Sequence, residues 1–223
     1  MRRTAAAVLI AILFVGGPAG SDGGVEVDST AVPPRMHDDF IPYGKSRKRQ
    51  MARYSKRHYG TRTWHLRKRP VLVIHFTGGS GYRSAWNWFA SNAPARGELP
   101  GVCAHFIVGK NGVIHRLVRL GVRCRHAIGL NHRSIGIEMV QPAGEGSHWA
   151  ATQILERRPQ IRSALRLARY LRARFGIKMR NVIGHAMAKN SPYFRDLKGW
   201  RNDHTDWLWR DVKKFRRRLR RVS

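Results

Sequence analysis

Two stretches, Val71-Leu-Val-Ile-His75 and Asn181-Val-Ile-Gly-His185, decide the fold that this sequence predicts. Each contains a short apolar run of strand length, rich in β-branched residues, and each ends on a histidine. Because such runs are typical of buried strands, we expect both imidazoles at the carboxyl edge of one sheet. Ligand sites gather at that edge in open α/β sheets.

Further strands and helices are predicted around these stretches. Residues 104–108 and 113–116 flank Gly109-Lys-Asn-Gly112, whose Asn-Gly pair is typical of a hairpin turn. Residues 134–140 predict another strand, and residues 160–175 carry apolar side chains on one helical face and arginines on the other. Shorter helices are expected over 84–92 and 207–219. This order of elements predicts an α/β fold, a single domain with a mixed central β-sheet flanked by helices.

The beginning of the chain predicts export. Arg2 and Arg3 precede an apolar stretch, Ala5 to Val15, and Gly17-Pro-Ala19 follows with small residues suited to cleavage. We interpret residues 1–19 as a signal peptide, and a periplasmic or extracellular protein is therefore expected. The alternative is a short membrane anchor, although the apolar stretch is brief for a span.

The charge of the chain is strongly positive. It has 43 lysines and arginines against 13 acidic residues, a net charge of +30, which favours polyanionic partners. Residues 20–69 are interpreted as a flexible linker and basic arm, and residues 213–223 as a basic C-terminal tail. Tyr54, Tyr59 and Trp64 between the cations would suit a nucleic-acid arm. Predicted export instead favours contact of the arm with anionic envelope polymers, and no specific nucleic acid is expected.

Two cysteines, Cys103 and Cys124, flank the predicted hairpin. In an oxidising compartment an even pair is compatible with one disulfide, and the alternative is two buried thiols. The disulfide is favoured because export is predicted.

The histidines at the two strand ends, with the acidic cluster Asp203-His-Thr-Asp206 behind the second, suggest a metal site. Two histidines, one carboxylate and an open position for water suit a hydrolytic zinc centre. Glu138 lies in an otherwise apolar strand, where an unpaired carboxylate is costly. Either Glu138 faces solvent, or it serves as a general base beside the metal.

Four motifs together resemble the zinc-dependent N-acetylmuramoyl-L-alanine amidase family, which includes AmpD-type amidases, phage T7 lysozyme and the peptidoglycan recognition proteins. In family order they are VIHFTGG at 73–79, AHFIVGKNGVIHRL at 104–117, RHAIGLNHRSIGIEMV at 125–140 and VIGHAMAKNSPYF at 182–194. The resemblance implies an amidase catalytic domain over residues 70–212. It also implies hydrolysis of the amide between the lactyl group of N-acetylmuramic acid and L-alanine in peptidoglycan, with Zn2+ as cofactor.

By position in the motifs, the resemblance implies roles for individual residues. His75 and His185 match the two histidine ligands of zinc, and Glu138 matches the catalytic glutamate. Some relatives use a tyrosine where this chain has Ala104, which gives Glu138 more weight. His126 and Asn131 are assigned to the substrate groove, and the alternative for His126 is a structural hydrogen bond.

The third zinc ligand has two candidates. The family places an aspartate or cysteine shortly after the second histidine, commonly before Pro-Gly, which this chain lacks. We prefer Asp206 over Asp203, and His204 then stands where relatives have a catalytic lysine or threonine. The resemblance implies that Glu138 moves the proton and His204 steadies the oxyanion. The alternative function is a non-catalytic peptidoglycan-binding module with a cationic arm.

Overall fold

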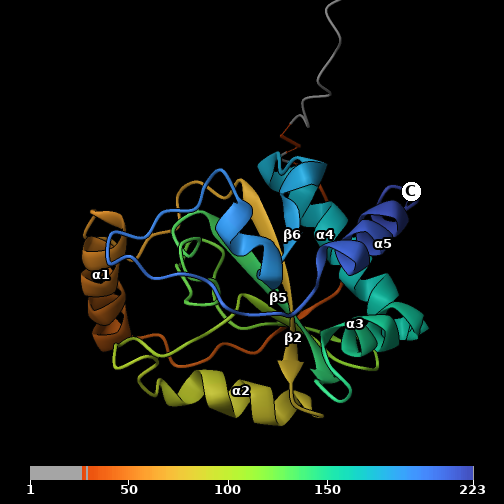
Figure 1. The fold of residues 1–223 in the computed structure, drawn as a ribbon, viewed down its shortest axis with the longest axis horizontal. Coiled ribbons are helices and arrows are strands. Elements are labelled where there is room, and N and C mark those ends of the chain that lie inside the picture. The colour runs from red at the N-terminus through yellow and green to blue at the C-terminus, as the bar shows by residue number, and fades with distance from the viewer. Residues whose placement is uncertain (1–26, 29, 223) are drawn as a thin grey trace, which may run out of the picture.

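The computed structural model describes residues 27–28 and 30–222, so the predicted signal peptide lies outside the described residues (Figure 1). Six strands form one sheet in the order β1-β4-β3-β5-β2-β6. Only β3 and β4 pair antiparallel, and the other neighbours are parallel, which confirms the mixed sheet. The strands are β1 (His37–Asp38), β2 (Val71–Gly78), β3 (Phe106–Val108), β4 (Ile114–Arg116), β5 (Ser134–Pro142) and β6 (Val182–Gly184).

Helices cover both faces of this sheet (Figure 1). They are α1 (Lys45–Tyr59), α2 (Tyr82–Ser91), α3 (Ser147–Glu156), α4 (Arg158–Phe175) and α5 (Trp209–Leu219), with short 3-10 turns η1 (Met179–Asn181) and η2 (His185–Asn190). No helix among the described residues is both long and apolar enough to cross a membrane.

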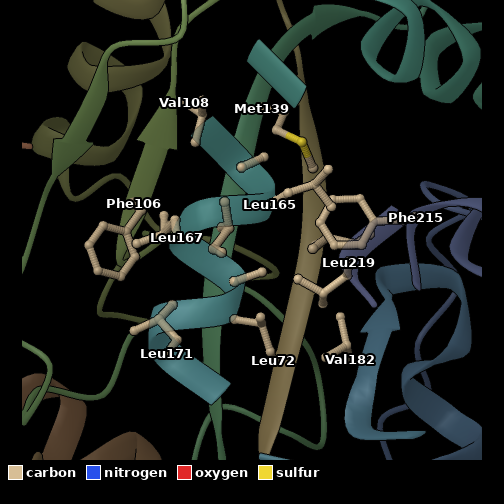
Figure 2. Close-up of a cluster of buried hydrophobic side chains, with 14 of the residues drawn as sticks. Leu72, Phe106, Val108, Met139, Leu165, Leu167, Leu171, Val182, Phe215 and Leu219 are labelled. Atoms are coloured by element: carbon tan, nitrogen blue, oxygen red, sulfur yellow. The ribbon is translucent and has the colours of Figure 1, made fainter. Parts of the chain in front are cut away.

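The main core lies between the sheet and α3, α4 and α5. Figure 2 shows Leu165, Leu167 and Leu171 of α4 in the same cluster as Phe106 and Phe215. Side chains alternate along a strand, so Leu72 and Ile74 of β2 join this core while Val71 and Val73 pack on the other face. His75 follows the same alternation and lies on the face opposite α4.

Helix α1 differs from the flexible arm that the composition suggested over residues 20–69. Met51, Tyr54 and Tyr59 are buried in a cluster of their own, with Trp64 and Trp200 packed against it. Arg47, although charged, is 3% exposed and donates hydrogen bonds to the carbonyl oxygens of Phe89 in α2 and of Val102 in the following loop. Helix α1 is therefore a packed amphipathic helix, and most of its cations other than Arg47 lie on its exposed face.

The expected basic tail at 213–223 also differs from the structure. Val212, Phe215 and Leu219 of α5 are buried in the main core. Arg216 donates from Nε to the carbonyl oxygen of Val182 at 2.8 Å, which ties α5 to β6. The apolar stripe of α5 packs into the core and anchors the helix. Arg217 and Arg218 lie on its outer, exposed face.

The two cysteines form the disulfide favoured from the sequence. Cys103 and Cys124 are bonded, with Cα atoms 5.2 Å apart, and both are fully buried. Cys124 stands two residues before His126, so the bridge fastens the start of the loop that carries this histidine.

Candidate active site

Three side chains from distant parts of the chain converge at one end of the sheet. His75 comes from β2, His185 begins η2 directly after β6, and Asp206 lies in the loop before α5. The two Nδ1 atoms are 3.1 Å apart, and the Asp206 carboxylate oxygens lie 3.3 Å from Nδ1 of His75 and 3.0 Å from Nδ1 of His185. All three residues are buried.

Close backbone packing brings Asp206 to this place. A Cβ atom on Gly184 would lie 1.9 Å from the carbonyl oxygen of Trp207, so only glycine lets this loop cross β6 here. Ala186 donates its backbone N–H to the carbonyl oxygen of Asp206 at 2.9 Å. The Asn202 side chain donates to the carbonyl oxygen of His185 at 2.8 Å, which holds the same loop from its other end.

The donor set and its spacing fit a zinc ion. Tetrahedral zinc, with ligand bonds of about 2.0–2.2 Å, requires donor atoms that lie roughly 3.3–3.5 Å from one another. The three separations of 3.0 to 3.3 Å come close to this spacing.

Asp206, not Asp203, meets the two histidines. Asp203 is largely exposed and accepts an ion-paired hydrogen bond from Arg96 at 2.5 Å. Its neighbour Asp206 is 8% exposed and contacts both rings. The preferred candidate from the sequence is the one that the structure places in the metal-binding group.

Burial and mutual charge set the protonation of the group. Burial, and next the neighbouring His185, lowers the pKa of His75 to about 4, so this ring is neutral at pH 7. Burial acts to raise the pKa of Asp206, but His185 and the hydrogen bonds from both rings outweigh it and keep this pKa below its ordinary value. Neutral imidazoles and an ionised carboxylate are the forms that bind a metal.

Glu138 lies beside the group and not on a solvent-facing surface. On β5 it stands in register with His75 of β2, and it is 8% exposed. Its Oε2 has no hydrogen-bond partner among the described residues. Burial, and next the charge of Asp206, raises the pKa of Glu138 well above its ordinary value. A raised pKa makes the ionised carboxylate a stronger base than that of an ordinary glutamate.

His126 lies behind His75 as well as along the cleft. Its Nδ1 is 3.1 Å from Nε2 of His75, and its Nε2 lies 3.2 Å from the Ser134 hydroxyl. A Cβ on Gly136 would approach Nδ1 of His126 to 2.7 Å, so the glycine makes room for this ring. Partners of this kind fix the orientation of a ligating imidazole. Contact of His126 with substrate stays a prediction.

Asn131 uses its polar atoms inside the protein. Its Oδ1 accepts the backbone N–H groups of His126 and Ala127, both at 2.8 Å, and its Nδ2 donates to the Tyr59 hydroxyl at 3.1 Å. Asn131 lines the cleft, but these bonds shape the His126 loop. The link to Tyr59 of α1 escaped the sequence analysis, because nothing in the spacing connects residues 72 positions apart.

His204 stands at the mouth of the site. Its ring stacks on His185 with centroids 4.1 Å apart and planes at 17°, and its Nδ1 is 3.9 Å from an oxygen of Asp206. Burial, and next His185, lowers the pKa of His204. A neutral, partly exposed ring here can present an N–H to a ligand.

The site opens into a cleft of about 760 Å³. Its walls include Thr77 and Gly78 from the end of β2, Trp88 from α2, and Arg96. Trp88 is 58% exposed, which is unusual for so large an apolar side chain. No signal in the sequence indicated a role of Trp88 in this wall.

The comparisons agree with the resemblance stated from the motifs. A family model described as N-acetylmuramoyl-L-alanine amidase matches residues 66–196, more than half of the chain. Among solved structures, the endolysin amidase LysCS from Clostridium intestinale is 16% identical, with 82% of this chain and 96% of that chain covered and a TM-score of 0.44. A search of curated proteins gave no significant match.

Two further solved structures contain a bound ligand. AmiD from E. coli, in complex with the substrate anhydro-N-acetylmuramic acid-L-Ala-D-gamma-Glu-L-Lys, is 22% identical, covers 67% of this chain and 58% of its own, and has a TM-score of 0.45. AmpDh3 from Pseudomonas aeruginosa, in complex with anhydromuramic pentapeptide, is 20% identical, covers 67% and 60%, and has a TM-score of 0.44. With the family model matched over residues 66–196, this chain belongs to the N-acetylmuramoyl-L-alanine amidase family.

Proposed function

We propose that this protein is a zinc-dependent amidase that cleaves the bond between the lactyl group of N-acetylmuramic acid and L-alanine in peptidoglycan. The observation that carries the proposal is the convergence of His75, His185 and Asp206 beside a buried Glu138 in a member of this family. Two histidines and a carboxylate leave a fourth position for water or substrate.

Each residue of the site has a task in this hydrolysis. His75, His185 and Asp206 would hold a zinc ion that, when bound, would polarise the scissile carbonyl and lower the pKa of water. Glu138, with its raised pKa, accepts a proton from the attacking water and returns it to the departing amine nitrogen. His126 keeps the His75 ring in place through its 3.1 Å contact.

His204 stabilises the negative charge that develops on the carbonyl oxygen. The stack on His185 holds its ring next to the site, and its partial exposure leaves an N–H free to face the substrate. Removing one such donor typically costs about 2.7–4 kcal/mol of barrier, or roughly a 100- to 1,000-fold loss in kcat.

A non-catalytic peptidoglycan-binding module is the alternative function. Among the described residues, Oε2 of the buried Glu138 has no hydrogen-bond partner, so this side chain costs folding free energy. A module that only binds would gain nothing in return for this cost, whereas a hydrolase gains a general base. Zinc content and product formation together separate the two functions.

The test is digestion of purified peptidoglycan, with free stem peptides detected by mass spectrometry. The wild-type protein should release them, and a chelator should stop the release. Asp206→Ala should lose both zinc and activity, whereas its matched control Asp203→Ala should keep both. Glu138→Gln should bind zinc and release no product. Zinc binding without any release by the wild type would instead support the binding module.

Export to the periplasm or the cell exterior is part of the proposal. The predicted signal peptide at residues 1–19 supports it, and the Cys103–Cys124 disulfide is compatible with an oxidising compartment. N-terminal sequencing of protein recovered outside the cytoplasm should find cleavage after Ala19. An uncleaved chain held in the membrane would contradict this part.

A further inference from the structure

A second groove, of about 770 Å³, lies apart from the catalytic cleft. Lys68 precedes β2 and Arg133 precedes β5, so the groove borders the amino ends of these parallel strands. His75 and Glu138 come from later positions of the same strands. The two grooves share no lining residue, so the second groove is a separate site.

The charge of this groove has one sign. It is lined by five cationic side chains and by no acidic one, and the cations are Arg67, Lys68, Arg123, Arg133 and Arg195. Within residues 30–222, the arginines found in ion pairs are others, at positions 57, 96 and 116. The groove therefore gathers positive charge that the protein itself does not neutralise.

Arg123 is the buried member of this set. It is 9% exposed, and neither its Nε nor its Nη1 has a hydrogen-bond partner in the described part of the chain. The Nδ1 of His132, in the same groove, is also buried without a partner. An unpartnered buried guanidinium is costly, and an anion seated in the groove would offset that cost.

The lowered pKa of His132 indicates the same positive potential in the groove. Its ring stacks on Tyr59 with centroids 4.3 Å apart. Burial lowers the pKa of His132 to about 3, and the charges of Arg123, Arg133 and Arg195 contribute to the decrease. Three guanidinium groups thus act on one point of the groove.

We propose that this groove is a binding site for a phosphate group, carried by an anionic envelope polymer or a lipid headgroup. Guanidinium groups match phosphate oxygens in a planar, paired geometry, and phosphate brings several acceptor oxygens. Three residues that carry hydroxyl groups, Thr61, Thr63 and Tyr193, also line the groove. Such a site would hold the protein on a phosphate-bearing component while the catalytic cleft stays open.

The first test is calorimetric titration of the full chain with inorganic phosphate, at an ionic strength kept constant with sodium chloride. Wild type should bind saturably, and Arg123→Gln should bind at least about tenfold more weakly. The matched control is Arg169→Gln, an exposed α4 residue with the same loss of charge. Equal affinities for wild type and Arg123→Gln, or equal weakening in both variants, would contradict the site and indicate diffuse electrostatics or binding elsewhere.

A second measurement, thermal unfolding, distinguishes a lost binding site from a misfolded variant. In phosphate-free buffer, Arg123→Gln should unfold at the wild-type temperature or above, because it removes an unpartnered buried charge. Phosphate should raise the unfolding temperature of wild type and Arg169→Gln more than that of Arg123→Gln. If Arg123→Gln does not fold, Arg133→Gln takes its place in both measurements, with the same outcomes supporting or contradicting the site.

The source of the phosphate is distinguished with two larger probes. Glycerol-phosphate oligomers and phosphatidylglycerol vesicles are each titrated with wild type and Arg123→Gln. Weaker binding of the variant to the oligomers alone assigns a polymer, and weaker binding to vesicles alone assigns a lipid headgroup. No difference with either probe contradicts the proposal. None of these readouts uses hydrolysis. Failure of the phosphate-site proposal can therefore be distinguished from failure of the proposed amidase activity.

Discussion

Glu138 meets opposite requirements in folding and in catalysis. Its carboxyl is buried, its Oε2 has no hydrogen-bond partner within the part of the chain that the structure describes, and burial raises its pKa well above the ordinary value. A carboxyl group with a raised pKa stabilises the folded state below its unfolded pKa and loses that contribution as pH rises through the folded pKa. At pH 7.5, the metal-free protein therefore carries a cost at this position.

Replacing Glu138 by glutamine should make this cost measurable. We expect Glu138→Gln to raise the free energy of unfolding of the metal-free protein at pH 7.5 by roughly 1–2 kcal/mol, while amidase activity is lost. Urea denaturation measures the first effect and product release the second. Glu145→Gln, at an exposed position, is the matched control and should change neither. A Glu138→Gln protein less stable than wild type would show that the carboxylate is well solvated.

Single residues near strand ends were predictable from the sequence, but the contacts that place them were not. His75, His185 and Glu138 stand in apolar runs whose burial the pattern indicates. Asp206 was preferred over Asp203 on the resemblance alone. The physical causes are Gly184, which admits the loop, and Arg96, which pairs with Asp203, and neither leaves a signal in local spacing.

Helix α1 illustrates the same limit for whole elements. Its many cations suggested a mobile arm, but Met51, Tyr54 and His58 recur at helical spacing and are all buried. His58 bonds Asp196 at 2.9 Å and Glu98 at 3.1 Å, and both partners are distant in sequence. Local composition thus misled the interpretation, because tertiary contacts decide whether an amphipathic cationic helix packs.

Substitutions on opposite faces of α1 should separate a packed helix from an arm. Met51 is fully buried, so Met51→Ala should lower the free energy of unfolding by about 2–5 kcal/mol. Arg53→Ala, on the exposed face of the same helix, should change it by less than about 0.5 kcal/mol. Urea denaturation followed by tryptophan fluorescence measures both. Wild-type stability for Met51→Ala would mean that this segment does not belong to the cooperative unit.

The molecule as a whole combines a large surface charge with buried, neutral histidines. The charge favours polyanions, and the structure gathers part of it into a groove that is lined by folded segments and not by a free arm. Around the sheet, His75 and His105 are buried, and burial lowers the pKa of each to about 4. Such rings prepare the site for a metal, but they also make the metal-free fold sensitive to acid.

Acid should therefore destabilise the metal-free protein before its carboxylates of ordinary pKa are protonated. A histidine with a lowered folded pKa contributes stability that is present above its unfolded pKa, about 6.5, and is lost as pH falls through the folded pKa of about 4. For the fully buried His105 this contribution is on the order of 3 kcal/mol. We expect the free energy of unfolding to fall between pH 6.5 and 4, and urea denaturation at fixed ionic strength measures it.

Two variants assign the acid sensitivity to the buried rings. His105→Gln should be less stable at pH 7.5, because His105 bonds the Val122 carbonyl oxygen at 3.0 Å and accepts the Gly136 N–H at 3.0 Å, but its stability should fall less between pH 6.5 and 4. His65→Gln, at an exposed position, should follow the wild-type profile. Glu138 acts with the opposite sign in this range, so Glu138→Gln should steepen the fall. A wild-type stability profile that stays flat from pH 7 to 4 would contradict this prediction, because it would mean that these rings become charged in the folded state. For the fully buried ring of His105, charging inside the protein is costly.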